Sequence, residues 1–242
     1  MEAYLQKHGS EAEITAIQHA DLSIATSKQL QKDLTQLSGK KVELLPNAAD
    51  YDLFKTAFTD KLEKPEDLQK IPQPIIGYTG NICHRVDYDL IQAICRSHPD
   101  KNLVMVGPRN HSGHTDIDLD EIPNLHFLGP KRLEQLPSYL AHFDVLILPF
   151  LINEVTKSIY PLKINEYLAS GKPIVATPFS EDIEAFGHLI SLEADHLLFA
   201  EGIAMELKGN SAEKSIKRNE EASKNTWEAR AETFWTLLNQ TL

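Results

Sequence analysis

The feature that most constrains the fold is a regular alternation of short apolar segments with helical segments from Pro74 onward. The most apolar segment, residues 143–150, predicts a central strand that is buried on both faces. Alternation of this kind with short turns predicts an α/β fold with a doubly wound, mostly parallel sheet. Ligands of such sheets bind at the carboxyl ends of the strands, near the topological switch point. We therefore expect ligand contacts in the loops that follow strands, at residues 77–87, 107–121, 129–131 and 150–163.

The first 50 residues predict a separate strand–helix–strand unit. Residues 22–25 and 40–46 have the pattern of short strands, and a helix between them begins after Ser27. Two strands and two helices cannot cover both faces of a sheet, so the unit should join the main sheet or be the remnant of a second domain. We expect it to expose an apolar face or a strand edge, and hence to dimerise, to dock or to be mobile.

Composition limits the class of partner. The chain has 242 residues with a formal net charge of −11, which disfavours nucleic acid as a ligand. No apolar run reaches the ~18 residues of a membrane span, and the first residues lack the pattern of a secretory signal. Cys83 and Cys95 are too few for a disulfide framework and predict ordinary thiols of a cytoplasmic protein.

The strongest candidate site lies at the start of a helix expected from Pro161 to Ser170. Lys163 and Glu166 are three residues apart and so share one face of that helix. Backbone amides at the helix start and the Lys163 ammonium could hold a diphosphate, while Glu166 could accept hydrogen bonds from sugar or ribose hydroxyls. The spacing alone also fits a solvated Lys–Glu pair.

This segment resembles the nucleotide-sugar site of GT-B glycosyltransferases of group 1 (family 4-like), in which a glutamate precedes a Gly-Lys-Pro-Val-Val-like strand. Here Glu166 is followed by Tyr-Leu-Ala-Ser-Gly-Lys-Pro-Ile-Val. Residues 20–27, 42–54, 74–81 and 124–130 resemble other family elements in the same order. The resemblance covers residues 11–235, and the form "PLK…EYLASGKP" is closest to members linked to cell-surface polysaccharide synthesis.

The resemblance implies a Rossmann-like half of a GT-B fold with a helical carboxyl end, and an amino-terminal domain that is mostly absent. It divides the chain into a remnant of that domain with the crossover (1–50), a linker (51–73), a donor-binding domain (74–210) and terminal helices (211–242). It also implies retaining, metal-independent transfer of a hexosyl group from a UDP- or GDP-linked sugar, without a cofactor. The acceptor would be a glycan or a lipid-linked molecule, held through the absent domain.

The donor-binding residues expected from this alignment come from four loops and one helix. They are Gly80, Asn81, Arg85, Gly129, Asn153, Thr156, Ser158, Lys163 and Glu166. Ser158 stands where the family has the first of two glutamates, Asn81 where it has an arginine, and Asp87 where it has a lysine. The catalytic residues would lie in the absent domain, so the chain by itself should be inactive. We expect it in the cytoplasm, peripheral to the inner membrane at most, with a partner chain or second copy bound through residues 1–50.

Two alternative functions follow from the positions at which this sequence differs from the family pattern. The chain could be a non-catalytic nucleotide-binding or scaffold module that keeps the donor fold, or a nucleotide-sugar epimerase of similar architecture, for which no extra acid/base pair is found. Other patterns have simpler interpretations: Asp116, Asp118 and Asp120 as a solvated loop, His111 and His114 as loop histidines, and Trp227 and Trp235 as packing residues.

Overall fold

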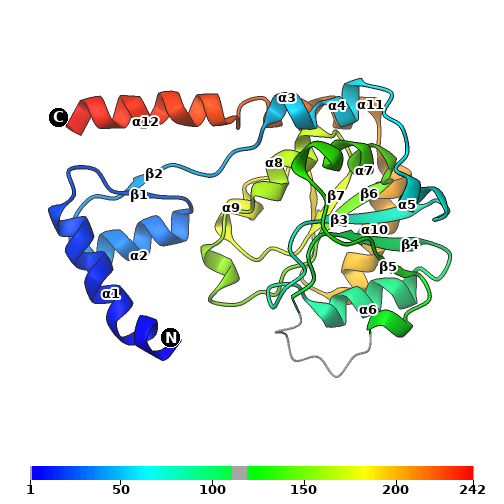
Figure 1. Cartoon of the computed structure of the whole chain (residues 1–242), viewed down its shortest axis with the longest axis horizontal. Helices are drawn as coiled ribbons and strands as arrows, with labels where there is room; N and C mark the ends of the chain where they lie inside the picture. The colour runs from blue at the N-terminus through cyan, green and yellow to red at the C-terminus, as the bar shows by residue number, and fades with distance from the viewer. Residues whose placement is uncertain (1, 111–118, 242) are drawn as a thin grey trace.

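The computed structural model describes residues 2–110 and 119–241. Its centre is a six-stranded parallel sheet with the strand order β5-β4-β3-β6-β7-β8 (Figure 1). The strands are β3 (Ile75–Thr79), β4 (Asn102–Val106), β5 (Leu125–Phe127), β6 (Val145–Leu148), β7 (Ile174–Ala176) and β8 (Ser191–Leu192). All residues of β3, β6 and β7 are buried, as expected for strands covered on both faces.

Helices cover both faces of this sheet, which confirms the predicted doubly wound fold. In Figure 1, α6 (Tyr88–Ser97) and α10 (His196–Gly209) lie below the sheet, and α7 (Leu136–His142) and α8 (Leu162–Ala169) lie above it. The face of α6 that meets the sheet has the predicted apolar residues Leu90, Ile91, Ile94 and Cys95. The Asp87 carboxylate caps this helix by accepting a hydrogen bond from the Leu90 amide at 2.9 Å.

Residues 51–73, expected as a linker, pack against the core instead of spanning open space. They form three short helices, α3 (Tyr51–Phe54), α4 (Thr56–Thr59) and α5 (Glu66–Gln69). Phe54 and Leu68 are fully buried, and Ile71 is buried beside them in the main hydrophobic core. The charged residues that suggested a linker face solvent, while the apolar residues between them cover the sheet half of the molecule.

The amino-terminal residues form the predicted strand–helix–strand unit beside the main sheet, at the left of Figure 1. It consists of α1 (Glu2–His19), β1 (Ile24–Ala25), α2 (Lys28–Ser38) and β2 (Glu43–Leu44). β1 and β2 pair in parallel as a two-stranded sheet of their own, so the unit does not extend the six-stranded sheet. It contacts the rest of the chain through the start of α2, where the Ser27 hydroxyl donates to the Ser158 carbonyl at 2.8 Å.

The last helices return toward this unit. α9 (Glu181–Glu184) and α11 (Ala212–Ala222) pack in the sheet half, whereas α12 (Trp227–Thr241) extends over β1 and β2 in Figure 1. The expectation that its tryptophans are packing residues is wrong, because Trp227 is 47% and Trp235 59% exposed. In the described part of the chain, α12 therefore offers an aromatic surface to solvent, and no helix there is long and apolar enough to cross a membrane.

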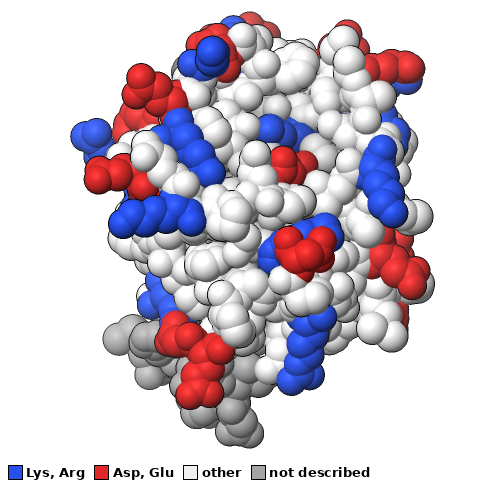
Figure 2. Space-filling model, turned by 90° about the vertical axis from the view of Figure 1, so that its right-hand side faces the viewer, with Lys and Arg blue, Asp and Glu red and all other residues white. Residues whose placement is uncertain are grey.

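Charged side chains are dispersed over the face at the right of Figure 1. Figure 2 shows basic and acidic residues interspersed on a mostly uncharged surface there. The described residues of this face therefore form no continuous basic stripe of the kind that binds a polyanion.

Candidate functional site

The switch point of the sheet lies between β3 and β6. From β3 the chain proceeds outward through β4 and β5 on one side, and from β6 through β7 and β8 on the other. The loops after these two strands meet: the Leu151 amide donates to the Arg85 carbonyl at 2.9 Å, and the Asp87 amide donates to the Pro149 carbonyl at 2.8 Å. We refer to the space outside these strand ends as the crevice, because ligands of this fold class bind at the switch point.

Glycines let three loops approach one another closely at this edge. The Gly80 amide donates to Val106, and the Gly107 amide donates to the Gly129 carbonyl at 2.9 Å. A Cβ added at Gly107 would lie 1.9 Å from the Gly80 carbonyl oxygen. Gly80 and Gly107 also have φ values of 132° and 150°, which other residues rarely adopt. Backbone therefore lines this part of the crevice.

Lys163 lies against the first of these loops. A Cβ added at Gly80 would be 1.8 Å from the Lys163 Cε atom. The Lys163 Nζ atom lies 5.7 Å from the ring centroid of Tyr78 and 5.8 Å from that of Phe150, within the range of a cation–π contact. The ammonium is therefore directed from the first turn of α8 to the ends of β3 and β6.

Glu166 stands one turn along α8 from this ammonium, and both side chains are half-buried. Burial lowers the pKa of Lys163, an effect that Glu166 opposes. Burial raises the pKa of Glu166, an effect that Lys163 opposes. Within the described part of the chain, neither group has a hydrogen bond or a close ion pair. Half-buried charges of opposite sign without close partners, beside a loop that follows a strand, have the character of a ligand site.

Arg85 adds a second cation to the crevice. Its guanidinium lies 5.9 Å from the Phe150 ring centroid, and its Nε atom contacts the Cys83 sulfur at 3.4 Å. Its charge contributes to the lowered pKa of Lys163. A protein with net charge −11 thus has a local concentration of positive charge at the switch point.

Two other predicted site residues shape the loop after β6. The Asn153 side-chain oxygen accepts hydrogen bonds from the Val155 and Thr156 amides, both at 3.0 Å. Thr156 is fully buried, and its hydroxyl donates to the Leu151 carbonyl. The Asn153 side-chain oxygen and the Thr156 hydroxyl are consequently engaged within the loop.

The remaining predicted residues lie around the crevice. The Asn81 side-chain oxygen accepts a hydrogen bond from Asn110 at 3.1 Å, and its carbonyl accepts one from the Tyr78 hydroxyl at 2.9 Å. Ser158 presents its carbonyl to Ser27 of the amino-terminal unit. The structure therefore brings Gly80, Arg85, Lys163 and Glu166 together, with the other predicted residues supporting or flanking them.

The crossover segment holds the start of α8. The Asn47 side chain donates to the Tyr160 carbonyl at 3.0 Å, and the Asn165 side chain donates to the Asn47 carbonyl at 3.3 Å. Asn165 is fully buried and also accepts from the Tyr160 hydroxyl at 3.1 Å. The segment that connects the amino-terminal unit to the sheet half therefore contacts the start of α8, the helix that carries Lys163.

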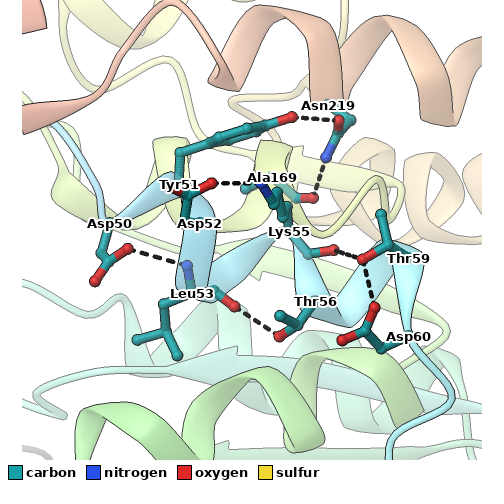
Figure 3. A network of polar contacts seen from close by, with 10 residues as sticks. All are labelled: Asp50, Tyr51, Asp52, Leu53, Lys55, Thr56, Thr59, Asp60, Ala169 and Asn219. Carbon is teal, nitrogen blue, oxygen red and sulfur yellow. Dashed lines mark hydrogen bonds and ion pairs between the residues drawn. The ribbon is translucent and has the colours of Figure 1, made fainter. Parts of the chain in front are cut away.

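The other end of α8 is fixed by α11 and α3 (Figure 3). The Asn219 side chain donates to the Ala169 carbonyl at 2.6 Å, and the Tyr51 hydroxyl donates to Asn219 at 2.8 Å. This contact anchors the carboxyl end of α8, at the end of the helix opposite Lys163.

Sequence reasoning missed two residues of this region, Phe150 and Tyr167. Phe150 is the ring beside which both cations lie, and Tyr167 bonds to the end of β3. A tyrosine on the apolar face of a helix was a usable signal, because a buried hydroxyl needs a partner. Which partner it finds depends on the packing of α8 against the sheet.

The described residues contain no group of three or more His, Cys, Asp or Glu side chains that could hold a metal ion. Asp120 pairs with Arg109 at 2.5 Å, and His111, His114, Asp116 and Asp118 lie outside the described residues.

Comparison with known proteins identifies the family. The family model of group 1 glycosyl transferases matches residues 73–208, more than half of the chain and all the elements that form the crevice. The chain belongs to this family. It is 29% identical over 170 residues to TuaH of Bacillus subtilis (strain 168), which is named as a teichuronic acid biosynthesis glycosyltransferase. The match covers 69% of the present chain and 42% of TuaH, so the chain spans less than half of that relative's length.

Solved structures share its fold. Anabaena Alr3699/HepE in complex with UDP-glucose superposes with a TM-score of 0.72 at 20% identity, over 97% of this chain and 69% of that chain. Sucrose-phosphate synthase from Thermosynechococcus elongatus gives a TM-score of 0.71 at 19% identity, over 97% of this chain and 61% of that chain. The six-stranded sheet of this group 1 glycosyltransferase chain is accordingly the Rossmann-like half of a GT-B fold.

Proposed function

We propose that the crevice between β3 and β6 binds the diphosphate of a UDP- or GDP-linked sugar. The observation that carries the proposal is a pair of half-buried charges on α8, which have no close partner among the described residues, with Lys163 lying against the glycine loop after β3. The Lys163 ammonium would contact the diphosphate, with Arg85 adding positive potential. Glu166 would accept hydrogen bonds from hydroxyls of the ribose, and the loop at Gly129 would contact the base.

UDP is the first nucleotide to test. The HepE structures, which share the fold, contain UDP with glucose or UDP-glucose. The acidic surface of the chain favours a single nucleotide held locally over a polymeric nucleic acid. No metal or cofactor is part of this proposal.

The reaction we propose is retaining transfer of a hexosyl group. The bond between the anomeric carbon and the diphosphate breaks, and the nucleoside diphosphate leaves with the bonding electrons. The acceptor oxygen forms a bond to the anomeric carbon, and the proton of its hydroxyl passes to the departing diphosphate. The name of TuaH supports a cell-surface polysaccharide or its precursor as acceptor, with transfer on the cytoplasmic side. The acceptor and the remaining catalytic groups would be supplied on the side of the amino-terminal unit, so that the residues of this chain alone would not suffice for turnover.

The test is replacement of Lys163 by alanine. We expect Lys163→Ala to weaken UDP binding by about 1–3 kcal/mol, or roughly 5- to 150-fold, because it removes a charge-assisted contact to the diphosphate. Isothermal titration calorimetry with UDP and with GDP measures the change. Lys157→Ala is the matched control: Lys157 lies in the loop that precedes α8 and pairs with Glu154 at 2.5 Å. Equal affinities of the two variants would reject the assignment.

A second candidate function is a non-catalytic nucleotide-binding or scaffold module. It is favoured by Ser158, which stands where the family resemblance places a sugar-binding glutamate, and by the engagement of Asn153 and Thr156 within their loop. The two functions differ in the consequence of Glu166→Gln. A glycosyltransferase assembled with its acceptor-binding partner should lose hexosyl transfer in this variant, whereas a scaffold should keep its partner affinity unchanged.

We also propose that a partner chain or a second copy binds through residues 1–50 together with α12. The support is an isolated two-stranded sheet whose Ile24 is 41% exposed, adjoining a helix with two exposed tryptophans. Unpaired strand edges and apolar surface of this kind are characteristic of interfaces.

A further inference from the structure

The end of β3 lacks a strand partner on the side of β6. Toward β4, all five residues from Ile75 to Thr79 are paired. Toward β6, the ladder comprises the pairs Ile76–Val145 and Gly77–Leu146. The two strands therefore diverge over the last residues of β3, where the crevice opens. Backbone groups on that side of Thr79 need other hydrogen-bond partners, because buried amides and carbonyls are rarely left unpaired.

A side chain of α8 supplies them. The Thr79 amide donates to the Tyr167 hydroxyl at 2.8 Å, and that hydroxyl donates to the Thr79 carbonyl at 3.3 Å. The Thr79 hydroxyl lies 3.4 Å from the same oxygen. Tyr167 is fully buried, and burial raises its pKa, so the phenol stays neutral and can both accept and donate. One hydroxyl thus occupies the place of a strand residue.

We propose that Tyr167 is a positioning residue of the donor site, which holds β3 apart from β6 and fixes Gly80 against Lys163. The sequence neighbours of the two bonded residues carry the argument. Thr79 directly precedes Gly80, and Tyr167 lies one helical turn after Lys163 and directly after Glu166. A bond between Thr79 and Tyr167 therefore sets the spacing between the glycine loop and the charged pair. The ligand involved is the diphosphate of the proposed function, on which this inference rests.

The experiment compares Tyr167→Phe with Tyr51→Phe. Tyr51 also donates one hydrogen bond between elements, to Asn219, but away from the crevice. UDP affinity is measured by calorimetry, thermal unfolding by calorimetric scan, and exchange of the Thr79 amide by NMR. We expect both variants to unfold at a lower temperature, since each loses a hydrogen bond. Only Tyr167→Phe should bind UDP roughly tenfold more weakly. Its Thr79 amide should also exchange about tenfold faster, because this amide loses the Tyr167 hydroxyl that accepts its hydrogen bond.

The outcomes separate this inference from the proposed function. If UDP affinity and Thr79 exchange in Tyr167→Phe both match those of Tyr51→Phe, the positioning role is overturned. If the unaltered protein binds no UDP, the proposed function fails, and faster Thr79 exchange in Tyr167→Phe still supports the link while unchanged exchange overturns it. If Tyr167→Phe does not fold, exchange of the Thr79 amide is compared with that of other amides in the unaltered protein. The Thr79 amide must exchange as slowly as the amides paired between β3 and β4, and faster exchange overturns the proposal.

Discussion

Lys163 shows how a charged side chain is accommodated at the switch point. Its stem crosses the face of Gly80, where any side chain would collide, and its ammonium lies between two aromatic rings. These rings and Glu166 offset part of the cost of withdrawing the charge from water. The offset is incomplete, because burial still lowers the pKa of Lys163. A more strongly anionic partner, such as a diphosphate, would therefore stabilise the charged form of Lys163 further.

The lowered pKa predicts how UDP affinity depends on pH. Lys163 carries its full charge below its lowered pKa and loses the charge as pH rises through that value. UDP should therefore bind most tightly near neutral pH and progressively more weakly at alkaline pH, starting below the ordinary lysine pKa of about 10.4. Calorimetry from neutral to alkaline pH measures this. Lys163→Arg is the control, since a guanidinium stays charged throughout. A decline of the same size in that variant would assign the titration to another group.

At the scale of elements, the start of α2 is held by α9. The Asp182 carboxylate is buried and accepts a hydrogen bond from the Lys28 amide at 3.1 Å. Glu181 adds an exposed contact to Lys32 at 2.6 Å. Carboxylates at a helix start stabilise it through the unpaired amides there. This contact links the amino-terminal unit to the sheet half on the side where the loop after β6 ends.

Asp182→Ala should loosen the amino-terminal unit. The substitution leaves the Lys28 amide without its acceptor, which costs about 1–3 kcal/mol where the group stays buried. We expect faster hydrogen–deuterium exchange, measured by mass spectrometry, in peptides from residues 20–46 and unchanged exchange in β3 and β6. Glu184→Ala, an exposed position on the same helix, serves as the control. Equal exchange in both variants would show that the carboxylate does not hold this unit in place.

At the scale of the whole molecule, the sheet half has a buried hydrophobic core, whereas the amino-terminal unit and α12 leave much of their apolar surface exposed. The sheet half has a continuous core from Phe54 to Ala222. The amino-terminal unit and α12 have few buried side chains, and no residue of α12 is buried. The amino-terminal unit and α12 therefore have apolar surface that a partner could cover, in agreement with the interface proposed above.

The two tryptophans of the chain report on this interface, because both lie on α12. In dilute solution we expect their fluorescence to be readily quenched by acrylamide. If a second copy binds there, quenching should decrease as protein concentration rises, while light scattering shows the mass increase to that of a dimer. Trp235→Glu should prevent both changes, and Met205→Glu, an exposed apolar site on α10, should not. A constant monomer mass with constant quenching excludes self-association and leaves a different partner chain as the occupant to seek.

The sequence placed Lys163 and Glu166 on one face of a helix, and the glycine after β3 lies in the loop that Lys163 contacts. The burial of Leu68 and Ile71 within residues 51–73 could not be predicted, because charge and proline content say little about which way these side chains face. Phe150 and Tyr167 were missed because their partners are more than ten residues away in the chain and are set by packing.

What the sequence by itself determined is the periodic part of the molecule: which segments are buried strands, which helices have one apolar face, and which charges share a helical turn. These follow from local backbone geometry and the removal of apolar surface from water. Only the tertiary structure decided how far β3 and β6 diverge, and that the Tyr167 hydroxyl fills the opening between them. It also decided that Lys163 is half-buried beside Gly80, where burial lowers its pKa, because the free energy of a charge depends on all the atoms that surround it.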